Sequence, residues 1–469
     1  MKRITGELVI ELEDMRTGVR ETVSETNMVT NAVNDILGMN PMGAMYNIGA
    51  VNDDYLVWNG SLLPICPNMI GGILLFPGAV SESADNIYLT SPDLPVAYAS
   101  NDVNATANTK RGSLNLTESM ALANGYKFVW EFTPSQGNGT IAAACLTSKY
   151  GGANAFGSET GVDTTLLKLQ KLDIRSLGVD VFNELLRAVT VDFEHSKLYS
   201  IAYAANTVTI KRYRIPLFDI GLNEKLDEPT LTLEDTRVLQ CQTFRFTGSG
   251  SSYGIFIDGG DGYWYGFANA GNASGNASVY WIKISQSDHT FTEGQWTLSN
   301  AALMPAGKFL EGSSYPTAER NAVIRGGWLY VPAYDKTGLY KIRLANSTDV
   351  RFIGFGFTSA MRSIGDTGSS EVKLTMIDDL IVGYDFEVDV SDNVIPNYAG
   401  IRTECIGTPF FRYKEFAFAW GCTYMYKYRY VYLLTPYLAT ICNLDHAVVK
   451  SADKSMKITY TLTERDAGA

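Results

Sequence analysis

The chain has 469 residues, of which 46% are apolar and 19% are charged. This composition can bury large cores and excludes a disordered chain. At about 150 residues per domain, the length indicates roughly three domains, or two if one is a large all-β unit. Asp and Glu number 50 against 38 Lys and Arg, which gives a net charge of −12. Such an acidic chain disfavours nucleic acid and anionic membranes as primary partners, because both are polyanions.

The scarce residues argue against a metal centre or a cofactor. The three histidines, His195, His289 and His446, are far apart and form no HxH or HxxxH spacing. The six cysteines are also dispersed, so buried free thiols are expected rather than a disulfide framework. No apolar segment follows the first residues, and we therefore expect no signal peptide.

The N-terminal region, residues 1–160, predicts a β-hairpin, a short helix and an antiparallel β-sandwich. Leu8, Ile10 and Leu12 alternate with polar residues, and a turn at 16–18 precedes a returning strand. Thr30 or Asn31 can cap a short helix. Further strands are expected at 72–77, at 127–132 and at 141–147, with a polar loop over 98–113.

The middle region, residues 186–445, follows an expected linker at 161–185 and contains a weak repeat. Groups of apolar strands joined by tight turns recur, each followed by a Tyr-rich or Lys-containing strand; they lie at 187–213, 253–283, 322–342, 372–384 and 415–434. Their spacing is near that of propeller blades when loop insertions are allowed. The fold class is therefore all-β, with a β-propeller-like domain of five or six blades as first choice and a second, larger sandwich as the rival.

The C-terminal region, residues 446–469, predicts one half-buried strand that returns to the first domain. Met456, Ile458, Tyr460 and Leu462 alternate with Lys and Thr. Such a strand needs a neighbour for its backbone groups, and the N-terminal hairpin offers an edge of similar length. The alternative is that this strand completes a blade near residue 187.

Aromatic residues supply the candidate contacts to a receptor or glycan. Five tyrosines alternate along one expected strand and would share one face; they are Tyr424, Tyr426, Tyr428, Tyr430 and Tyr432. A second aromatic group is Tyr263, Trp264 and Tyr265. Either group could stack on sugar rings, and either could instead pack between blades or subunits.

Acidic residues supply two weaker hypotheses. Asp258 and Asp261 stand in a Gly-rich turn that could hold a cation, or could simply be a turn. The acidic residues of 385–392 would share a strand face that is solvated or recruits a cation. These two groups and Asp378 with Asp379 are also the concentrated acids that a glycan hydrolase would need. No nucleophile elbow or phosphate-binding loop is present in the sequence, and a non-enzymatic protein is expected.

Several phrases of the sequence resemble tail-fibre or baseplate-associated virion proteins of phages and prophages of gut Firmicutes. They are GELVIELE at 6–13, NMVTNAVNDIL at 27–37, GGILLFP at 71–77, RGSLNL at 111–116, GYKFVWEFTPSQGNGT at 125–140 and KSMKITYTLT at 454–463. The resemblance covers about the first 155 residues and the last 20, and it carries no active-site residues. It implies a structural role in a virion.

From these observations we expect a phage tail or baseplate component, a tail fibre or a receptor-binding protein, that acts in the virion after assembly in the host cytoplasm. Its expected partners are other virion proteins, a host cell-surface glycan and further copies of itself in a homotrimer. The alternatives are a collar or head decoration fibre without a receptor and a glycan-degrading tailspike.

Overall fold

The computed structural model is almost entirely β and consists of antiparallel sheets. It describes residues 3–37, 65–68, 70–87, 95–147, 188–215, 221–223, 232–245, 252–269, 277–301, 303, 310–311, 321–359, 374–396, 410–414, 416–423, 428–433 and 437–465. Within these residues there are two short helices, α1 (Asn31–Leu37) and α4 (Ile65–Asn68). Neither helix is long and apolar enough to cross a membrane. The expected linker at 161–185 lies outside the described residues.

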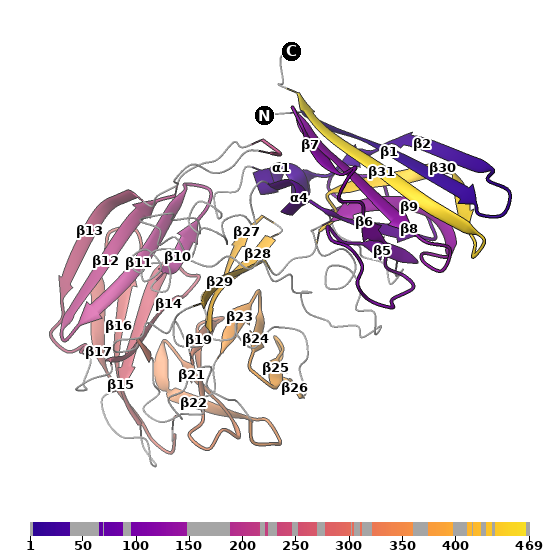
Figure 1. Ribbon diagram of the computed structural model, residues 1–469. Coiled ribbons are helices and arrows are strands. Elements are labelled where there is room, and N and C mark those ends of the chain that lie inside the picture. The colour runs from indigo at the N-terminus through magenta and orange to yellow at the C-terminus, as the bar shows by residue number, and fades with distance from the viewer. Residues whose placement is uncertain are drawn as a thin grey trace.

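Both ends of the chain build a sandwich-like unit of two sheets, and the two termini lie close together in Figure 1. The first sheet has the order β2-β1-β31-β8-β6, and β7 also pairs with β8. Its strands are β1 (Arg3–Asp14), β2 (Arg20–Thr26), β6 (Ser113–Leu114), β7 (Met120–Leu122), β8 (Gly125–Phe132) and β31 (Lys454–Arg465). The second sheet has the order β3-β30-β9-β4-β5. Its strands are β3 (Met28–Val29), β4 (Gly72–Phe76), β5 (Ala97–Ala99), β9 (Gly139–Thr147) and β30 (Thr440–Lys450).

The alternation of apolar residues in three strands produces the inner face of the first sheet. Their registers form rows of directly opposed side chains: Leu8–Tyr460–Phe128, Ile10–Ile458–Trp130 and Leu12–Met456–Phe132. All nine side chains are buried and share one cluster with residues of the second sheet, including Ile73, Leu75, Ala144 and Leu146. The opposite residues of the second sheet, such as Leu74, Phe76 and Cys145, are buried in a separate cluster. Because both of its faces are covered, β4 is a continuous apolar run rather than an alternating one.

The expected C-terminal ladder is confirmed, because β31 pairs with β1 along its length and with β8 on its other side. The alternative, in which this segment completes a blade near residue 187, is wrong. The return also begins earlier than the expected boundary at 446, since β30 starts at Thr440 and pairs with β9. The polar segment after β30 is therefore a connection between the two sheets of one unit. The ammonium group of Lys450 fixes it by donating to the carbonyls of Thr133 and Pro134 and to Asn138 Oδ1.

The middle of the chain forms five further sheets, each a meander in chain order. The first middle sheet contains β10 (Ala188–Asp192), β11 (Lys197–Ala204), β12 (Thr207–Arg214) and β13 (Thr232–Gln240). The second contains β14 (Ser252–Asp258), β15 (Tyr263–Asn269), β16 (Ala277–Ser285) and β17 (Phe291–Leu298), with β18 (Leu310–Glu311) beside β14. The third contains β19 (Val323–Arg325), β20 (Trp328–Pro332), β21 (Gly338–Arg343) and β22 (Asn346–Gly354).

The last two middle sheets are smaller within the described residues. The fourth contains β23 (Thr375–Ile377), β24 (Leu380–Val382), β25 (Phe386–Val388) and β26 (Val394–Pro396). The fifth contains β27 (Phe410–Tyr413), β28 (Phe416–Thr423) and β29 (Tyr428–Leu433). Each of the five strand groups read from the sequence falls in one of these sheets.

Successive middle sheets pack against one another through separate apolar clusters. Ile201 and Val208 of the first sheet share a cluster with Trp264 and Ile282 of the second. The opposite face of the second sheet meets the third in a cluster that includes Phe267, Val279, Leu329 and Ile342. The third meets the fourth in a cluster that includes Tyr330, Leu339, Phe386 and Val388. The second and third sheets are therefore buried on both faces.

Short segments connect the middle sheets to the sandwich-like unit. The carbonyl of Leu222 accepts from Cys66 N at 2.9 Å, and Leu222 N donates to a carboxylate oxygen of Glu464 at 3.0 Å. Asn223 donates to the carbonyls of Leu122 and Gly125. These contacts bring a short segment between β12 and β13 of the first middle sheet against both α4 and the final strand.

Candidate functional site: a basic and aromatic patch

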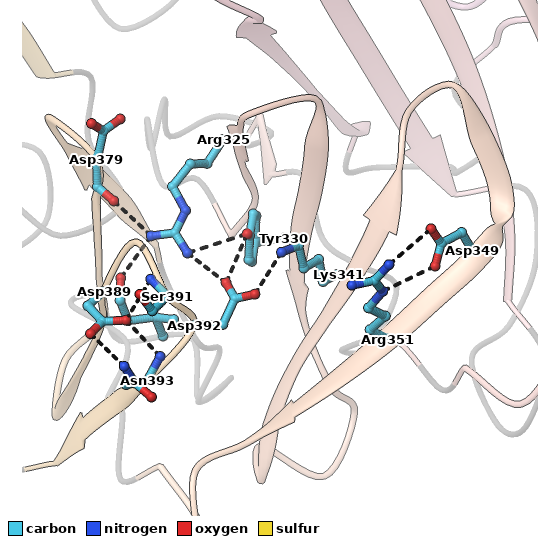
Figure 2. A network of polar contacts seen from close by, with 11 residues as sticks. Arg325, Tyr330, Lys341, Asp349, Arg351, Asp379, Asp389, Ser391, Asp392 and Asn393 are labelled. Atoms are coloured by element: carbon cyan, nitrogen blue, oxygen red, sulfur yellow. Dashed lines mark hydrogen bonds and ion pairs between the residues drawn. The ribbon is translucent and has the colours of Figure 1, made fainter.

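A polar network joins the third and fourth middle sheets at their hairpin turns (Figure 2). Arg325, at the end of β19, donates to the carbonyls of Asp379 and Val388 and to the carboxylate of Asp392 at 2.8 Å. The same carboxylate accepts from the Tyr330 hydroxyl at 3.0 Å and from Lys341 Nζ at 2.6 Å. The turn that carries Asp392 is shaped by Asp389, which accepts from the backbone N–H groups of Ser391 and Asn393. Asp392 thus connects three strands of one sheet, β19, β20 and β21, to a turn of the next.

The charges in this network stabilise one another. Burial acts to raise the pKa of Asp392, but the hydrogen bonds from Lys341 and Tyr330 outweigh it and hold this pKa below its usual value. Burial acts to lower the pKa of Lys341, and its contacts with Asp392 and Tyr330 reverse that effect and raise the pKa. Both groups are therefore charged at neutral pH.

Beside the network lies a surface that we call the Trp328 patch, defined by Trp328, Lys341, Arg343, Asp349 and Arg351. Arg343 is directly opposite Trp328, and Arg351 is directly opposite Lys341, so the strand alternation places these side chains on one face of the sheet. The three cationic groups lie 4.7, 5.5 and 4.7 Å from the Trp328 ring centroid, for Lys341, Arg343 and Arg351 respectively. Figure 2 shows Asp349 and Arg351 on the far side of Lys341 from Asp379 and Asp389.

The Trp328 patch has more positive than negative charge. Asp349 lies 3.2 Å from Arg351 Nε and 3.8 Å from Arg343 Nη1. The side chains of Arg343 and Arg351 are 54% and 60% exposed, so much of each guanidinium group faces solvent. Two exposed guanidinium groups share this one carboxylate, so within the described residues they have more N–H donors than Asp349 can accept, and such donors suit a carboxylate or phosphate ligand.

The patch is a local variation on a feature that recurs in the middle sheets. An aromatic residue on the second strand is opposite a cation on the third in three sheets: Tyr199 opposite Arg212, Tyr265 opposite Lys283 and Tyr330 opposite Lys341. This recurrence explains the Tyr-rich and Lys-containing pattern of the sequence. The residue opposite each cation on the fourth strand differs among the three sheets. It is Asp235 opposite Arg212 in the first, Thr292 opposite Lys283 in the second and Arg351 opposite Lys341 in the third. The third sheet therefore adds positive charge where the first adds a carboxylate.

The structure places the second aromatic candidate group largely inside the protein. Trp264 is 1% exposed, its Nε1 donates to Thr190 Oγ1 at 2.8 Å, and its ring stacks on His289. Tyr265 is also buried and donates its hydroxyl hydrogen to Asp261. The burial of both side chains argues against stacking on a sugar ring, and ligand contact by this group stays a prediction. Tyr263 is partly exposed, and Lys283 Nζ lies 3.8 Å from its ring centroid.

The five alternating tyrosines do not all lie in one described strand. β29 begins at Tyr428 and contains Tyr430 and Tyr432, and it is paired with β28 through registers such as Thr423 opposite Tyr428. Tyr424 and Tyr426 fall between these two strands and lie outside the described residues. A binding role for the five tyrosines therefore stays a prediction.

The candidate cation turn is held by donors of the protein itself. Asp258 accepts from Gly260 N, Gln286 Nε2 and Thr190 Oγ1. Asp261 accepts from Tyr263 N and from the Tyr265 hydroxyl. These contacts shape the hairpin and join it to the first middle sheet.

The other acidic candidates are also separated by their contacts. Asp378 pairs with Arg412 of β27, and Asp385 accepts from the Ser359 hydroxyl. Glu387 is 4% exposed rather than part of a solvated strand face, and burial raises its pKa. Among the described residues, no group of three or more His, Cys, Asp or Glu side chains could hold a metal ion.

Sequence reasoning missed the Trp328 patch because its residues lie on three strands. The segments WLY at 328–330, KIR at 341–343 and DVR at 349–351 each place alternate residues on one face. The sequence allows these three segments to be predicted as neighbouring strands of a meander. The pairing register of the strands is needed to show that Arg343 and Arg351 lie beside Trp328.

Comparisons with known proteins identify no family. No family model matches the chain, and no curated protein matches it. Among solved structures, AztD of Citrobacter koseri is 11% identical with a TM-score of 0.20, and the match covers 74% of this chain and 65% of that chain. A luciferin-regenerating enzyme is 8% identical with a TM-score of 0.19, covering 54% of this chain and 92% of that chain. At such TM-scores these likenesses carry no argument about fold or function.

Proposed function

We propose that this protein is a non-enzymatic structural component of a phage tail or baseplate that attaches the particle to the host surface. The proposal rests on the positions, within the fold, of the sequence segments that resemble virion proteins. The phrases at 6–13, 71–77, 125–140 and 454–463 supply β1, β4, β8 and β31, which all belong to the sandwich-like unit. Three of these strands are neighbours in one sheet. The segments that resemble virion proteins are thus one physical unit, as expected of an attachment module that carries an inserted domain.

We further propose that the five middle sheets are the blades of a β-propeller. Each is a meander, and adjacent sheets bury apolar faces against one another, as blades do. Ala188 and Leu198 of the first sheet and Phe411 of the fifth all belong to the large apolar cluster that extends into the sandwich-like unit. A propeller is a rigid disc whose loops can vary, and this property suits recognition.

The protein is proposed to act as a homotrimer within the virion, beside other tail or baseplate proteins. Its high tyrosine content supports self-association, because aromatic residues are enriched at interfaces. Light scattering of the purified chain tests this point. A monomer at high concentration, together with a single copy in the particle, would contradict it.

Two experiments test the proposed function. Antibody labelling of purified particles should mark the tail tip or baseplate, and labelled protein should bind intact host cells. Labelling of the head or collar without cell binding would favour a decoration fibre. Release of reducing sugar from host wall glycan would favour a tailspike enzyme. If purified particles contain none of the protein, the proposal is wrong.

A further inference from the structure

We propose that the Trp328 patch binds an anionic group, a carboxylate or phosphate carried by a host-wall polymer. This inference rests on the proposed attachment function and names its ligand chemistry. Arg343 and Arg351 would supply the contacts, and Trp328 would position them.

The geometry of the patch fits a doubly contacted anion. Arg343 and Arg351 both reach one carboxylate, that of Asp349, at 3.8 and 3.2 Å. Two guanidinium groups that already share one carboxylate are close enough to share another. Because each group has five N–H donors and remains more than half exposed, Asp349 leaves donors unused.

The arginines are restrained before any ligand arrives. Their guanidinium carbons lie 5.5 and 4.7 Å from the centroid of the Trp328 ring, within cation–π distance. Trp328 is itself on a strand paired on both sides, by Arg325 and by Arg343. Binding to restrained side chains costs less conformational entropy than binding to free ones.

The surrounding charges favour a short anionic group over a long polyanion. Asp392 balances Arg325 and part of Lys341, so the surplus charge is concentrated at the two arginines. The chain as a whole has a net charge of −12, and an extended polyanion such as nucleic acid would be repelled beyond the patch. A single carboxylate or phosphate on a mostly neutral polymer avoids that repulsion.

The test is a binding titration of the full chain with three defined probes. They are a neutral dextran that carries one terminal glucuronic acid, the same dextran with one terminal glycerol phosphate instead, and the same dextran with neither group. At low ionic strength we expect one of the two anionic probes to bind and the unmodified dextran not to bind. The two anionic arms distinguish a carboxylate source from a phosphate source. Failure of both to bind the folded protein would overturn the inference.

Variants of the Trp328 patch provide the second part of the test. Replacing both arginines, Arg343→Gln with Arg351→Gln, should weaken the bound probe about tenfold or more, because charge-assisted hydrogen bonds are lost. A matched control is Arg237→Gln, since Arg237 is 62% exposed and lies 3.2 Å from Asp235, two residues away, as Arg351 lies from Asp349. Asp349→Asn should instead tighten binding, because it removes the competing carboxylate. Equal binding by the double variant and the unaltered protein would refute the site.

The outcomes separate this inference from the proposed function. If particles contain the protein and cells bind it, but the double variant behaves like the unaltered protein, only the ligand assignment fails. If no particle contains the protein while the patch still binds an anionic probe, the attachment function fails and the site remains.

Discussion

Tyr460 of β31 donates its hydroxyl hydrogen to Thr440 Oγ1 of β30 at 2.5 Å, which joins the two sheets of the sandwich-like unit. Both residues are buried, and Asn27 Nδ2 donates to the same hydroxyl. The Tyr460 hydroxyl therefore joins three segments by hydrogen bonds: Asn27 just before β3, Thr440 at the start of β30, and β31 itself. Burial raises the pKa of Tyr460, so its hydroxyl stays protonated.

Tyr460→Phe should destabilise the protein by about 1–3 kcal/mol, because the Asn27 amide and the Thr440 hydroxyl lose a buried partner. Urea unfolding followed by far-UV circular dichroism measures the change. Tyr126→Phe is the control, since Tyr126 lies on the adjacent strand opposite Leu462 and no hydrogen bond to its hydroxyl is present among the described residues. Equal losses from both variants would show that the buried hydrogen bonds do not matter.

Much of this fold could be predicted from local alternation. The β1 and β31 strands were recognisable because Leu8, Ile10, Ile458 and Tyr460 alternate with polar residues, and such a pattern fixes which face is buried. Predicting the partner of β31 required a further argument. The backbone N–H and C=O groups of an unpaired strand need hydrogen-bond partners, and the edge of the N-terminal hairpin offers them over a similar length. The role of β30 was not predictable in this way, because a bulge between Asn443 and Val448 interrupts its pairing with β9.

The site could be predicted only in part, because burial on both faces of a sheet leaves no alternation to read. Trp264 and Tyr265 are adjacent in sequence, and they lie in different apolar clusters on opposite faces of one sheet. An exposed aromatic face and a doubly buried strand give the same sequence pattern. The Trp328 patch depends on registers across three strands, which a single sequence does not specify.

Trp264→Phe should destabilise the protein without changing its binding to host cells. The substitution leaves a cavity beside His289 and removes the donor to Thr190, and we expect a loss of about 1–3 kcal/mol. Tyr263→Phe, on the same strand and partly exposed, should change stability little. Thermal unfolding and cell binding measured on both variants check this prediction. Loss of cell binding by a folded Trp264→Phe protein would instead assign Trp264 to the ligand site.

Asp392→Asn should destabilise the contact between the third and fourth middle sheets. The variant leaves Arg325 and Lys341, which are 9% and 13% exposed, without their shared carboxylate, and we expect a loss of about 2–4 kcal/mol. Asparagine is the appropriate replacement because residue 392 has a φ of 65°, which Asn tolerates. Proteolysis should then cut the 374–396 region faster. Asp349→Asn, in an exposed pair, is the control and should leave this rate unchanged.

The same network should make the protein sensitive to acid. The pKa of Asp392 is lowered on folding, so its stabilisation is present above the unfolded pKa and is lost as pH falls through the folded value. The unaltered protein should therefore lose stability below about pH 4, the usual range of an aspartate. Asp392→Asn should show a smaller loss over the same interval. Parallel pH profiles of the two proteins would contradict the assignment.

Glu387→Gln should stabilise the protein at neutral pH, the opposite sign to the preceding variants. Glu387 faces Val382 and Ile395 on the neighbouring strands, and no donor to its carboxylate is found among the described residues. Burial raises its pKa, so the folded state binds this proton more tightly than the unfolded state does. Its contribution is consequently most favourable below the unfolded pKa and declines as pH rises through the folded pKa. Glutamine has nearly the same shape and no charge to desolvate, and a gain of about 1 kcal/mol at pH 7 is expected, shrinking toward pH 4.

Glu293→Gln is the matched control, because the Glu293 carboxylate accepts from the backbone N–H groups of Gln242, Thr243 and Phe244 and its loss should destabilise. Denaturant unfolding of both variants at pH 4 and pH 7 measures the two effects. A destabilised Glu387→Gln protein at pH 7 would mean that the carboxylate is charged and has a partner.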